Sequence, residues 1–531
     1  MSEASTTDVP WQRLSVRVIW VDIVVSVLSL SPGAVAIWGF GVEPSLDALW
    51  PLAIVAAVGV TGAVGDIIRW AFTTYRVTAV DIERRTGLFV KQHRTLRRER
   101  VRSVDTAAKL RHRLAGLRVV TVGAGQQTGS GESALVLDAL ARADAVALRE
   151  RLLADPDPDP VSISDPASAS DPASVPAGAD PATRGEDVEV FATFKPWWVV
   201  YNMFSIWAYL MAAGLSWGAF WLASSFGVDL FGFVTRFTDW GALGWVGIVL
   251  IALVVAGVIG AIGLGVNFLL GYWNFELARV RTSSRSYLRT RRGLLSTREV
   301  NRDESRMRGM SIGEPLLWRW MGMADTNVIT TGLSVWDPEE PTAILPRGPI
   351  SVARKVARDV FGDADPMSAP LTRHPRAALR RRLWWATVVS AIAPLALTVP
   401  AIAGVVPVWL PWATLGLWPI ALGAAVIAYR SLGHAIAGDH LVVRSGLFSR
   451  TTAALRRDAV STIAIRQSVL QRRLGLSTVS AMTAAGWSAY EAPDMPDSAA
   501  LTFAADAAPG VLDEFVEGGV AVERGFAVER G

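Results

Sequence analysis

The chain contains no cysteine, which excludes disulfide bonds, thiol catalysis and metal or iron–sulfur centres that use thiolate ligands. Its five histidines show none of the spacings of metal-binding motifs. The glycine-rich segment 123–131 lacks the Gly-Lys-Ser/Thr ending of a phosphate-binding loop, and no nucleophile is accompanied by a general base. We therefore expect no metal, no cofactor and no enzymatic activity.

Charged residues are also scarce, at 19% of the 531 residues, whereas apolar residues make up 51%. A soluble globular protein usually carries about 25% charged residues. The 22 tryptophans favour a membrane protein, because tryptophan collects at the interfaces between membrane and water. Lysine is rare as well, so nearly all of the positive charge is carried by arginine, and these arginines are clustered.

Six apolar stretches are long enough to cross a bilayer, and they fall into three pairs. Arginines flank the outer ends of the pairs, whereas the loops inside the pairs hold at most one. The positive-inside rule therefore predicts a multi-pass protein of the cell membrane, with both termini and the three large segments outside the pairs in the cytoplasm. The pairs cover roughly residues 18–40 with 50–68, 197–226 with 242–273, and 383–406 with 409–429.

An Arg-x-Gly-Leu element occurs three times, each time shortly after a predicted helix pair. The copies read "RTGLF" at 85–89, "RRGLL" at 291–295 and "RSGLF" at 444–448. Aligned on the glycine of this element, the three regions match without gaps, which indicates a repeat of a helix pair followed by a cytoplasmic domain. We call these glycines the anchors: Gly87, Gly293 and Gly446.

Each repeated domain shows the same predicted elements. A strand breaks at the anchor and a second strand follows, as in a strand–turn–strand unit. Further strands and a short helix come next, the helix at 108–116 in the first copy and 468–475 in the third. The third copy then predicts a strand at 499–503 ("AALTF") and a closing helix at 509–517. About 80 residues of this pattern predict a small β-barrel that buries its own core.

The third copy, "VSTIAIRQSVLQRRLGLSTVSAMT" at 460–483, resembles the signature of membrane-flanked bacterial domains that are similar to pleckstrin-homology (PH) domains. With a helix pair before each such domain, the chain is similar to the YdbT-type membrane proteins. The resemblance implies a PH-like β-barrel with a C-terminal helix after each helix pair. It implies no enzymatic activity.

The predicted fold class is therefore an α+β integral membrane protein, with six transmembrane helices in three pairs, each pair followed by a PH-like barrel. The transmembrane pairs are expected at residues 13–72, 191–273 and 380–431, and the PH-like domains at 73–154, 274–362 and 432–518. Residues 155–190 are rich in proline, aspartate and serine and predict a disordered linker. The remaining segments are an N-terminal tail, a second linker and a disordered C-terminal tail, at 1–12, 363–379 and 519–531.

Arginines are the candidate binding residues of these domains. Six of them keep their sign in all three copies, two positions before and twenty-six after the anchor: Arg85, Arg291, Arg444, Arg113, Arg319 and Arg472. The motifs "LRRERV" and "LRRDAV" of the outer copies add Arg97, Arg98, Arg456 and Arg457. Asp303 and Glu304 occupy the equivalent positions in the second copy.

The arginine clusters predict binding of anionic lipids in the inner leaflet, which attract each nearby basic residue by about 1 kcal/mol. A membrane-protein partner or self-association would use the same surface, and the alternative is that the arginines only solvate it. Nucleic acid is not expected as a partner, because no reading helix or aromatic platform is recognisable.

The expected function is a non-enzymatic scaffold anchored in the membrane. The alternative is a transporter or lipid-handling channel built from the six helices. Polarity inside the membrane discriminates between them, and it is sparse, with the acidic Asp22 inside the first predicted span. It lies near Arg17 at the cytoplasmic end, which favours a paired interface residue over a transport path.

Overall fold

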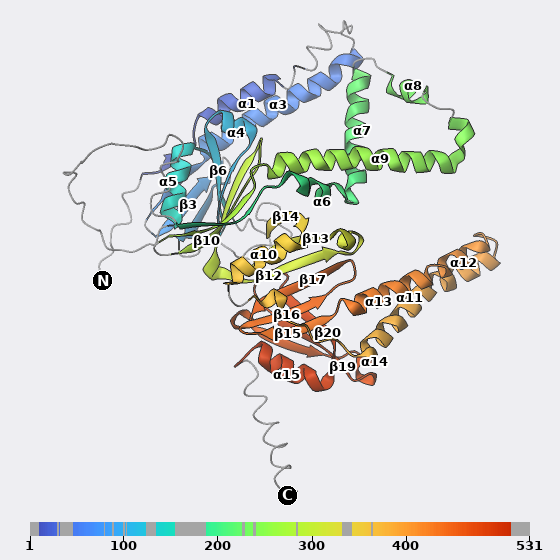
Figure 1. Cartoon of the computed structure of the whole chain (residues 1–531). Coiled ribbons are helices and arrows are strands. Elements are labelled where there is room, and N and C mark those ends of the chain that lie inside the picture. The colour runs from blue at the N-terminus through green and yellow to red at the C-terminus, as the bar shows by residue number, and fades with distance from the viewer. Residues whose placement is uncertain are drawn as a thin grey trace. The chain divides into compact units, whose positions relative to one another are not determined.

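The computed structural model describes residues 10–28, 31, 46–78, 80–87, 90–98, 101, 103–123, 134–153, 187–225, 229–236, 240–282, 285–331, 342–362 and 365–510. The chain divides into two compact units, Met1–Ser305 and Arg306–Gly531, which we call the first and the second unit. Both units combine helices with antiparallel sheets (Figure 1).

Helices of the first unit account for part of the predicted membrane spans. α9 (Trp240–Tyr272) contains the apolar segment Gly244–Tyr272, which is long enough to cross a membrane. It is preceded by α6 (Val199–Met203), α7 (Trp207–Ser225) and α8 (Leu230–Thr235). α7 and the helical segment before it meet at a bend of 94°, so together they form either a broken span or a re-entrant loop.

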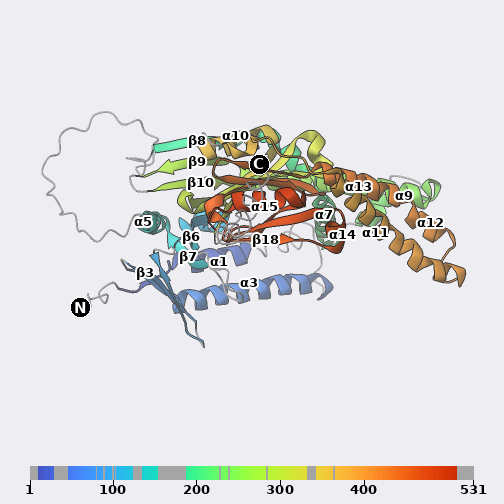
Figure 2. The ribbon, with the colours of Figure 1, turned by 90° about the horizontal axis from the view of Figure 1, so that it is seen from below.

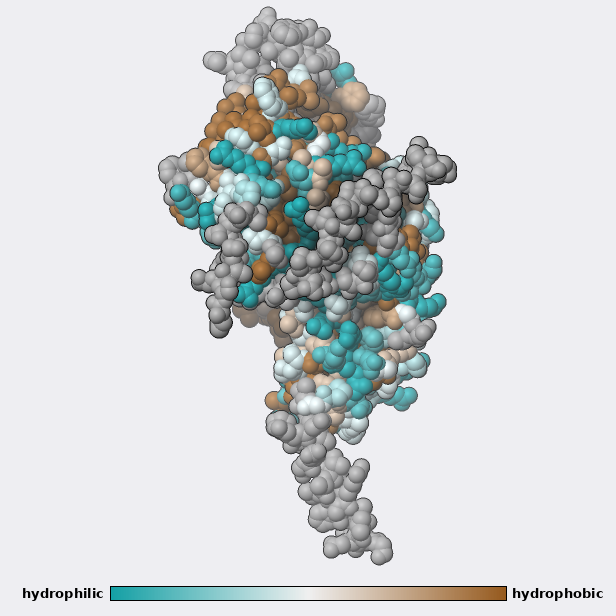
Figure 3. Space-filling model, turned by 90° about the vertical axis from the view of Figure 1, so that its left-hand side faces the viewer, coloured by the Kyte–Doolittle hydropathy of each residue, from teal (hydrophilic) through white to brown (hydrophobic). Residues whose placement is uncertain are grey.

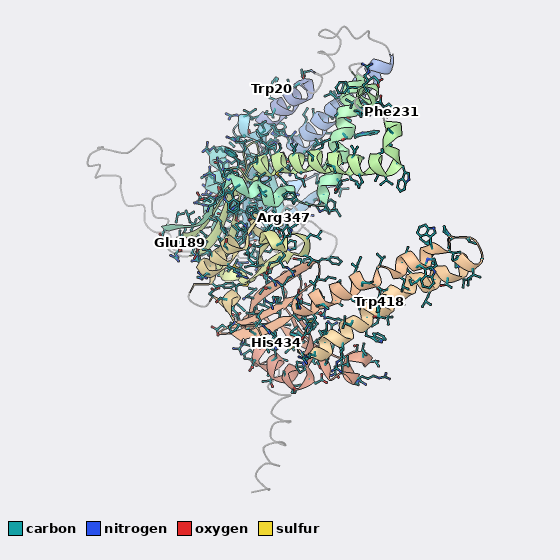
Figure 4. All side chains as sticks on the ribbon, turned by 45° about the vertical axis from the view of Figure 1, so that its right-hand side comes forward. Trp20, Glu189, Phe231, Arg347, Trp418 and His434 are labelled. Atoms are coloured by element: carbon teal, nitrogen blue, oxygen red, sulfur yellow. The ribbon has the colours of Figure 1, made fainter. Side chains whose placement is uncertain are left out.

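The first predicted pair corresponds to α1 (Arg17–Leu28) and α3 (Leu46–Phe72). Residues 29–30 and 32–45 and the side chain of Asp22 lie outside the described residues, so this pair and the role of Asp22 stay predictions. Figure 3 shows hydrophobic residues gathered toward the top of the molecule, where Figure 1 places α1 and α3. Trp20 on α1 is 68% exposed, as a lipid-facing residue would be (Figure 4).

The second unit carries the third predicted pair. Arg376–Ile402 (α11) and Trp409–Arg430 are both long and apolar enough to cross a membrane. The latter segment comprises α12 (Trp409–Leu415) and α13 (Trp418–Arg430), and Trp418 ties α13 to α11 by donating from its indole Nε1 to Thr387 Oγ1 at 3.1 Å (Figure 4). The described residues thus hold three candidate spans, or four if the bent pair is one span, and their orientation stays a prediction.

Two sheets form the β-structure of the first unit, and all of their strand pairs are antiparallel. One has the order β1-β2-β3-β4, from Gln12–Arg13, Thr74–Val77, Asp81–Thr86 and Gln92–Arg97. The other has the order β7-β6-β5-β11-β10-β9-β8, and Figure 2 shows β8, β9 and β10 side by side. Its strands β5 to β11 are Ser103–Ala108, Leu117–Gly123, Ala134–Ala141, Asp187–Thr193, Glu276–Arg281, Ser286–Arg292 and Thr297–Asp303.

The second unit repeats this plan. Its larger sheet has the order β14-β13-β12-β17-β16-β15, and its smaller sheet has the order β18-β19-β20. The strands β12 to β17 are Met307–Pro315, Met323–Thr330, Ala343–Pro349, Gly433–Ala437, His440–Ser445 and Ser449–Arg456. The strands β18 to β20 are Thr462–Arg466, Leu476–Met482 and Ala489–Pro496.

The first and third copies of the repeat each enclose one core between two sheets. In the first copy, Ile82 from β3 packs with Val104 from β5 and Leu137 from β7, and Leu148 of the closing helix α5 (Arg142–Leu153) joins them. In the third copy, strands β16 to β20 surround a core that the closing helix α15 (Asp497–Ala507) covers with side chains such as Phe503. In the first copy, α5 occupies the place of the expected closing helix.

The anchors adopt a left-handed backbone. Gly87, Gly293 and Gly446 have φ angles of 116°, 111° and 113°, and each lies in the turn between two paired strands. A Cβ atom on Gly293 would collide with the carbonyl oxygen of Ser296, so the turn requires glycine. The predicted strand–turn–strand unit is therefore confirmed.

The end of the third copy differs from the expectation. The segment 499–503, predicted as a strand, lies in α15, and the last strand is instead β20. β20 contains Pro493 and Asp494, whose φ of 64° interrupts the ladder, and such residues are depleted in strands. The helix expected at 509–517 lies almost entirely outside the described residues.

Neighbouring copies share their larger sheets. β5 of the first copy pairs with β11 of the second, and β12 of the second pairs with β17 of the third. We call these pairings the first and the second junction. They explain why the compact units divide at Ser305, inside the predicted domain 274–362. The predicted domain boundaries stay a prediction.

Candidate functional site

The anchor turns lie beside the ends of the membrane helices. In the second copy, the Gly293 amide donates to the Trp273 carbonyl at 2.8 Å and the Leu294 amide donates to the Leu270 carbonyl at 2.9 Å. Leu270 lies in the last turn of α9 and Trp273 directly follows its last residue, where the carbonyls lack partners within the helix. The turn therefore caps the helix.

The other two copies place the turn similarly. In the third, Arg444 Nε donates to the carbonyl of Ser431, the residue after α13, at 3.3 Å. A positive charge is favourable at this negative end of the helix. In the first, Thr73 follows α3 directly and its Oγ1 contacts Thr86 Oγ1 at the end of β3 at 3.3 Å. In each copy the strand leading into the anchor thus meets the end of a helix.

A short helix from the preceding copy completes each of the last two turns. Arg113 in α4 (Leu110–Leu114) donates to the Leu294 carbonyl. The Leu316 amide in η5 (Leu316–Met321) donates to the Phe448 carbonyl at 2.7 Å. The two junctions therefore build composite surfaces, in which one copy supplies a short helix and the next supplies the anchor turn.

Both composite surfaces expose large apolar side chains beside arginine. The first patch consists of Arg113, Leu114, Leu294 and Leu295 in the first unit, and its Leu114 is 83% exposed. The second patch consists of Leu317, Arg319, Trp320 and Phe448 in the second unit, where Trp320 is 80% and Phe448 83% exposed. Apolar, aromatic and arginine side chains together at helix ends are typical of a membrane interface.

Polar contacts hold the second patch in place. Arg319 donates to the Glu314 carbonyl at 3.3 Å, and the Glu314 carboxylate forms an ion pair with Arg450. Burial and the neighbouring Arg450 lower the pKa of Arg319. The second patch thus contains an arginine whose position is fixed by contacts at the second junction.

The remaining predicted arginines of the first unit occupy separate positions. Arg85 is exposed and stacks over the Trp11 ring at 4.0 Å. Arg97 is exposed at the end of β4, and Arg98 donates to the Arg151 carbonyl while burial lowers its pKa. Arg291 is exposed on β10, opposite glutamates of both neighbouring strands.

The predicted arginines of the second unit differ in their availability. Arg456 forms an ion pair with Asp458, and Arg457 donates to the Gly438 carbonyl at 3.5 Å. Arg472 is exposed on α14 (Val469–Arg473). The structure therefore does not bring the ten predicted arginines to one site, and it places Arg113 and Arg319 in the patches. Their roles in binding stay predictions.

A buried polar cluster in the second unit was not predicted from the sequence. Asp494 is fully buried and forms ion pairs with Arg381 and, at 3.2 Å, with Arg382, both at the start of α11. His374 lies between the Asp494 carbonyl and the His434 ring, with His434 Nδ1 and His374 Nε2 3.1 Å apart. Figure 4 shows His434 where the paired helices meet the strands. The cluster joins residues far apart in the sequence, so no spacing signals it.

The two histidines of this cluster are held neutral. Burial lowers the pKa of His434 to about 4, and the neighbouring His374 contributes to the shift. Burial also lowers the pKa of His374, against the opposing effects of its hydrogen bond to the Asp494 backbone and of the Asp494 charge. Among the described residues, no group of three or more His, Asp or Glu side chains is placed to hold a metal ion.

We expect the second unit to lose stability as the pH falls from about 6.5 to about 4. An unfolded histidine takes up a proton near pH 6.5, whereas His434 in the folded unit stays neutral down to about pH 4. The unfolded state binds more protons in this window, so the free energy of unfolding decreases as the pH falls, by on the order of 3 kcal/mol. Thermal unfolding of the detergent-solubilised chain across this range measures the effect.

His434→Asn should flatten this acid dependence, whereas His93→Asn, at an exposed ring in the first unit, should leave it unchanged. An unaltered slope in the His434→Asn variant would contradict the assignment. Asp494, Arg381 and Arg382 are unchanged in both variants.

Comparison with known proteins identifies two of the three predicted copies, the first and the third. Residues 24–155 and 386–506 match the Bacterial PH domain family. The chain is 22% identical over 437 residues to the UPF0699 transmembrane protein YdbT of Bacillus subtilis (strain 168), covering 78% of this chain and 80% of that relative. No solved structure gives a significant match.

Proposed function

Because this chain is a transmembrane protein that carries bacterial PH domains and is a distant homologue of the Bacillus subtilis protein, we propose that it is a membrane-anchored scaffold. In this proposal the PH-like copies rest against the inner leaflet. The observation that carries it is the pair of patches, in which exposed leucine, tryptophan and phenylalanine side chains adjoin Arg113 and Arg319.

Chain geometry keeps the strands close to the bilayer. α9 ends at Tyr272 and β9 begins at Glu276, and α13 ends at Arg430 and β15 begins at Gly433. Connections of this length span at most roughly 10–14 Å. The anchor turns cap or contact the same helix ends, so the patches lie at the depth of the lipid headgroups.

The composition of the patches suits that depth. Apolar side chains there leave water for the acyl boundary, which yields about 1.5–3 kcal/mol for a fully buried leucine or phenylalanine. Arginine keeps its stem in the apolar layer and its guanidinium among the phosphates. Anionic lipids add about 1 kcal/mol for each arginine near the surface.

Site-specific labelling tests the proposal, because the chain has no native cysteine. In the full chain reconstituted in bilayers, a fluorophore at Trp320→Cys or Leu114→Cys should be quenched by lipids brominated near the headgroup. The matched control is Leu501→Cys, which replaces another exposed apolar residue but lies on the closing helix α15. A fluorophore at this position should not be quenched.

The arginines should make the association depend on charge. We expect Arg319→Gln to reduce quenching at position 320 in anionic bilayers and to leave it unchanged in neutral ones. Added salt should have the same effect, because it screens exposed charges over about 8–10 Å at physiological strength. Equal quenching at positions 320 and 501, or none at 320, would contradict docking on the inner leaflet and favour a protein partner.

A further inference from the structure

The two junctions follow one rule. In each, the pairing strand from the second half of one copy joins the strand after the anchor turn of the next copy. Val104, seventeen residues after its anchor, faces Asn301, eight after the next anchor. Met310 and Ala454 have the same spacings and also face each other. The register of the pairing is therefore a property of the repeat.

Three copies supply three strands after an anchor turn and three pairing strands from the second half of a copy. The two junctions use two strands of each kind. Among the described residues, β18 and β4 each pair with a strand on one side only. β18 is the equivalent of β5 and β12, and β4 is the equivalent of β11 and β17. The outer copies therefore present two complementary sheet edges.

Exposure shows what these edges lack. Nineteen residues after the anchor, Thr106 and Ile312 are 5% exposed inside the junctions, whereas Ile465 in β18 is 39% exposed. Eight residues after the anchor, Asn301 is 5% and Ala454 0% exposed inside the junctions. The equivalent Thr95 in β4 is exposed. Both strands thus carry side chains that the repeat elsewhere covers with a neighbouring strand.

We propose that β18 of one chain pairs with β4 of a second, identical chain, in the register of the two junctions within the chain. Ile463 of one chain then faces Thr95 of the other chain, as Met310 faces Ala454 within the chain. The contact is an antiparallel strand addition that satisfies the free backbone donors and acceptors of both edges. It is independent of the docking of the patches on the membrane.

Charge is compatible with this register. Arg466 of β18 faces Gln92, and Arg94 of β4 faces Ala464, so no two basic residues are directly opposite. The two internal junctions each have an ion pair, Arg298 with Asp105 at 2.8 Å and Arg450 with Glu314. The proposed pairing of β18 with β4 has no such ion pair, because Ala464 and Gln467 stand at the positions equivalent to Asp105 and Glu314. The contact between two chains is therefore weaker than the two junctions within a chain, which suits a reversible assembly.

The symmetry of the contact determines the kind of assembly. A pairing of β18 with β4 is head to tail, since the two edges differ, and such contacts produce closed rings or open rows. Because every chain is anchored in the membrane, either form is confined to the bilayer plane. The partner that fits the edges is thus a second copy of the same chain.

Engineered cysteines test the pairing in native membranes, again without interference from native cysteines. Two chains with different tags are co-expressed, one with Thr95→Cys and the other with Ile463→Cys. Mild oxidation should give a crosslinked product that contains both tags. The matched control replaces Ile463→Cys with Ala464→Cys, whose side chain points to the other face of the strand. We expect at least about tenfold less product from the control.

A second variant measures the assembly itself. Ile465→Lys places a charge on the exposed edge, a device by which natural proteins block strand addition. It should abolish the crosslink and reduce the wild-type oligomer to single chains in native mass spectrometry, whereas Leu501→Lys, on α15, should do neither.

Three outcomes would overturn the proposal. One is a wild-type chain that is monomeric at every concentration and forms no product with both tags. Another is equal crosslinking in the off-register control. The third is a crosslink that forms only inside a chain carrying both Thr95→Cys and Ile463→Cys, since it would show that the edges close on each other within one chain.

Discussion

Asp494→Asn should destabilise the second unit by about 3–5 kcal/mol, the usual cost of breaking a buried ion pair by removing one partner. The substitution keeps the size of the side chain, and asparagine tolerates the φ of 64° found at this position. The negative charge is lost and an amide nitrogen replaces one acceptor oxygen, which leaves Arg381 and Arg382 without their counter-ion. Thermal unfolding of the solubilised chain, followed by hydrogen exchange of β19 and β20, measures the change.

Asp458→Asn is the matched control, because Asp458 forms an ion pair with Arg456 but both side chains are largely exposed. Exposed pairs contribute about 0–1 kcal/mol, so this variant should be close to the wild type. The role assigned to Asp494 would be wrong if the two variants lost similar amounts of stability. A large loss confined to Asp494→Asn would show that the cluster fastens the start of α11 to the third copy.

Gly293→Val should cost about 3 kcal/mol or more, because valine at a φ of 111° is strained and its Cβ collides with the Ser296 carbonyl. The damage should extend to the first copy. The turn positions β11, and β11 pairs with β5 on its other edge. Amide exchange of residues 103–108 should therefore accelerate in the variant.

The control for this variant is Gly271→Val, the same substitution at a helical glycine with no atom near its Cβ position. It should leave exchange in β5 unchanged. Independent barrels would confine the effect of Gly293→Val to the second copy. Unchanged protection of residues 103–108 in Gly293→Val would thus refute the coupling through the first junction.

Local chemistry explains which elements could be predicted. The anchor turns follow from glycine, which fits their backbone, and the helices α5 and α10 (Ile350–Phe361) agree with the C-terminal helix that the family resemblance implies. The strand β20 was missed because its prolines and its left-handed Asp494 conflict with strand propensity. The spans in the second unit follow from length and apolar composition.

Pairing between copies could not be predicted in the same way. The sequence of β5 fixes which side chains face the core, and nothing in it specifies whether its edge meets its own copy or the next. The patches share this limit, because the Arg113 side chain and the Leu294 carbonyl meet only through the first junction. The shared arginines therefore indicated a surface without showing how two copies build it.

The first junction also sets a condition on synthesis of the chain. β5 is complete at Ala108, whereas its partner β11 begins at Thr297, 189 residues later. At translation rates of 5–20 residues per second, the β5 edge waits roughly 10–40 s for its neighbour. Asp105 on that edge is a charge that discourages pairing with other nascent chains. When Arg298 arrives, the same carboxylate becomes part of an ion pair, so one residue protects the edge before assembly and is paired across the junction afterwards.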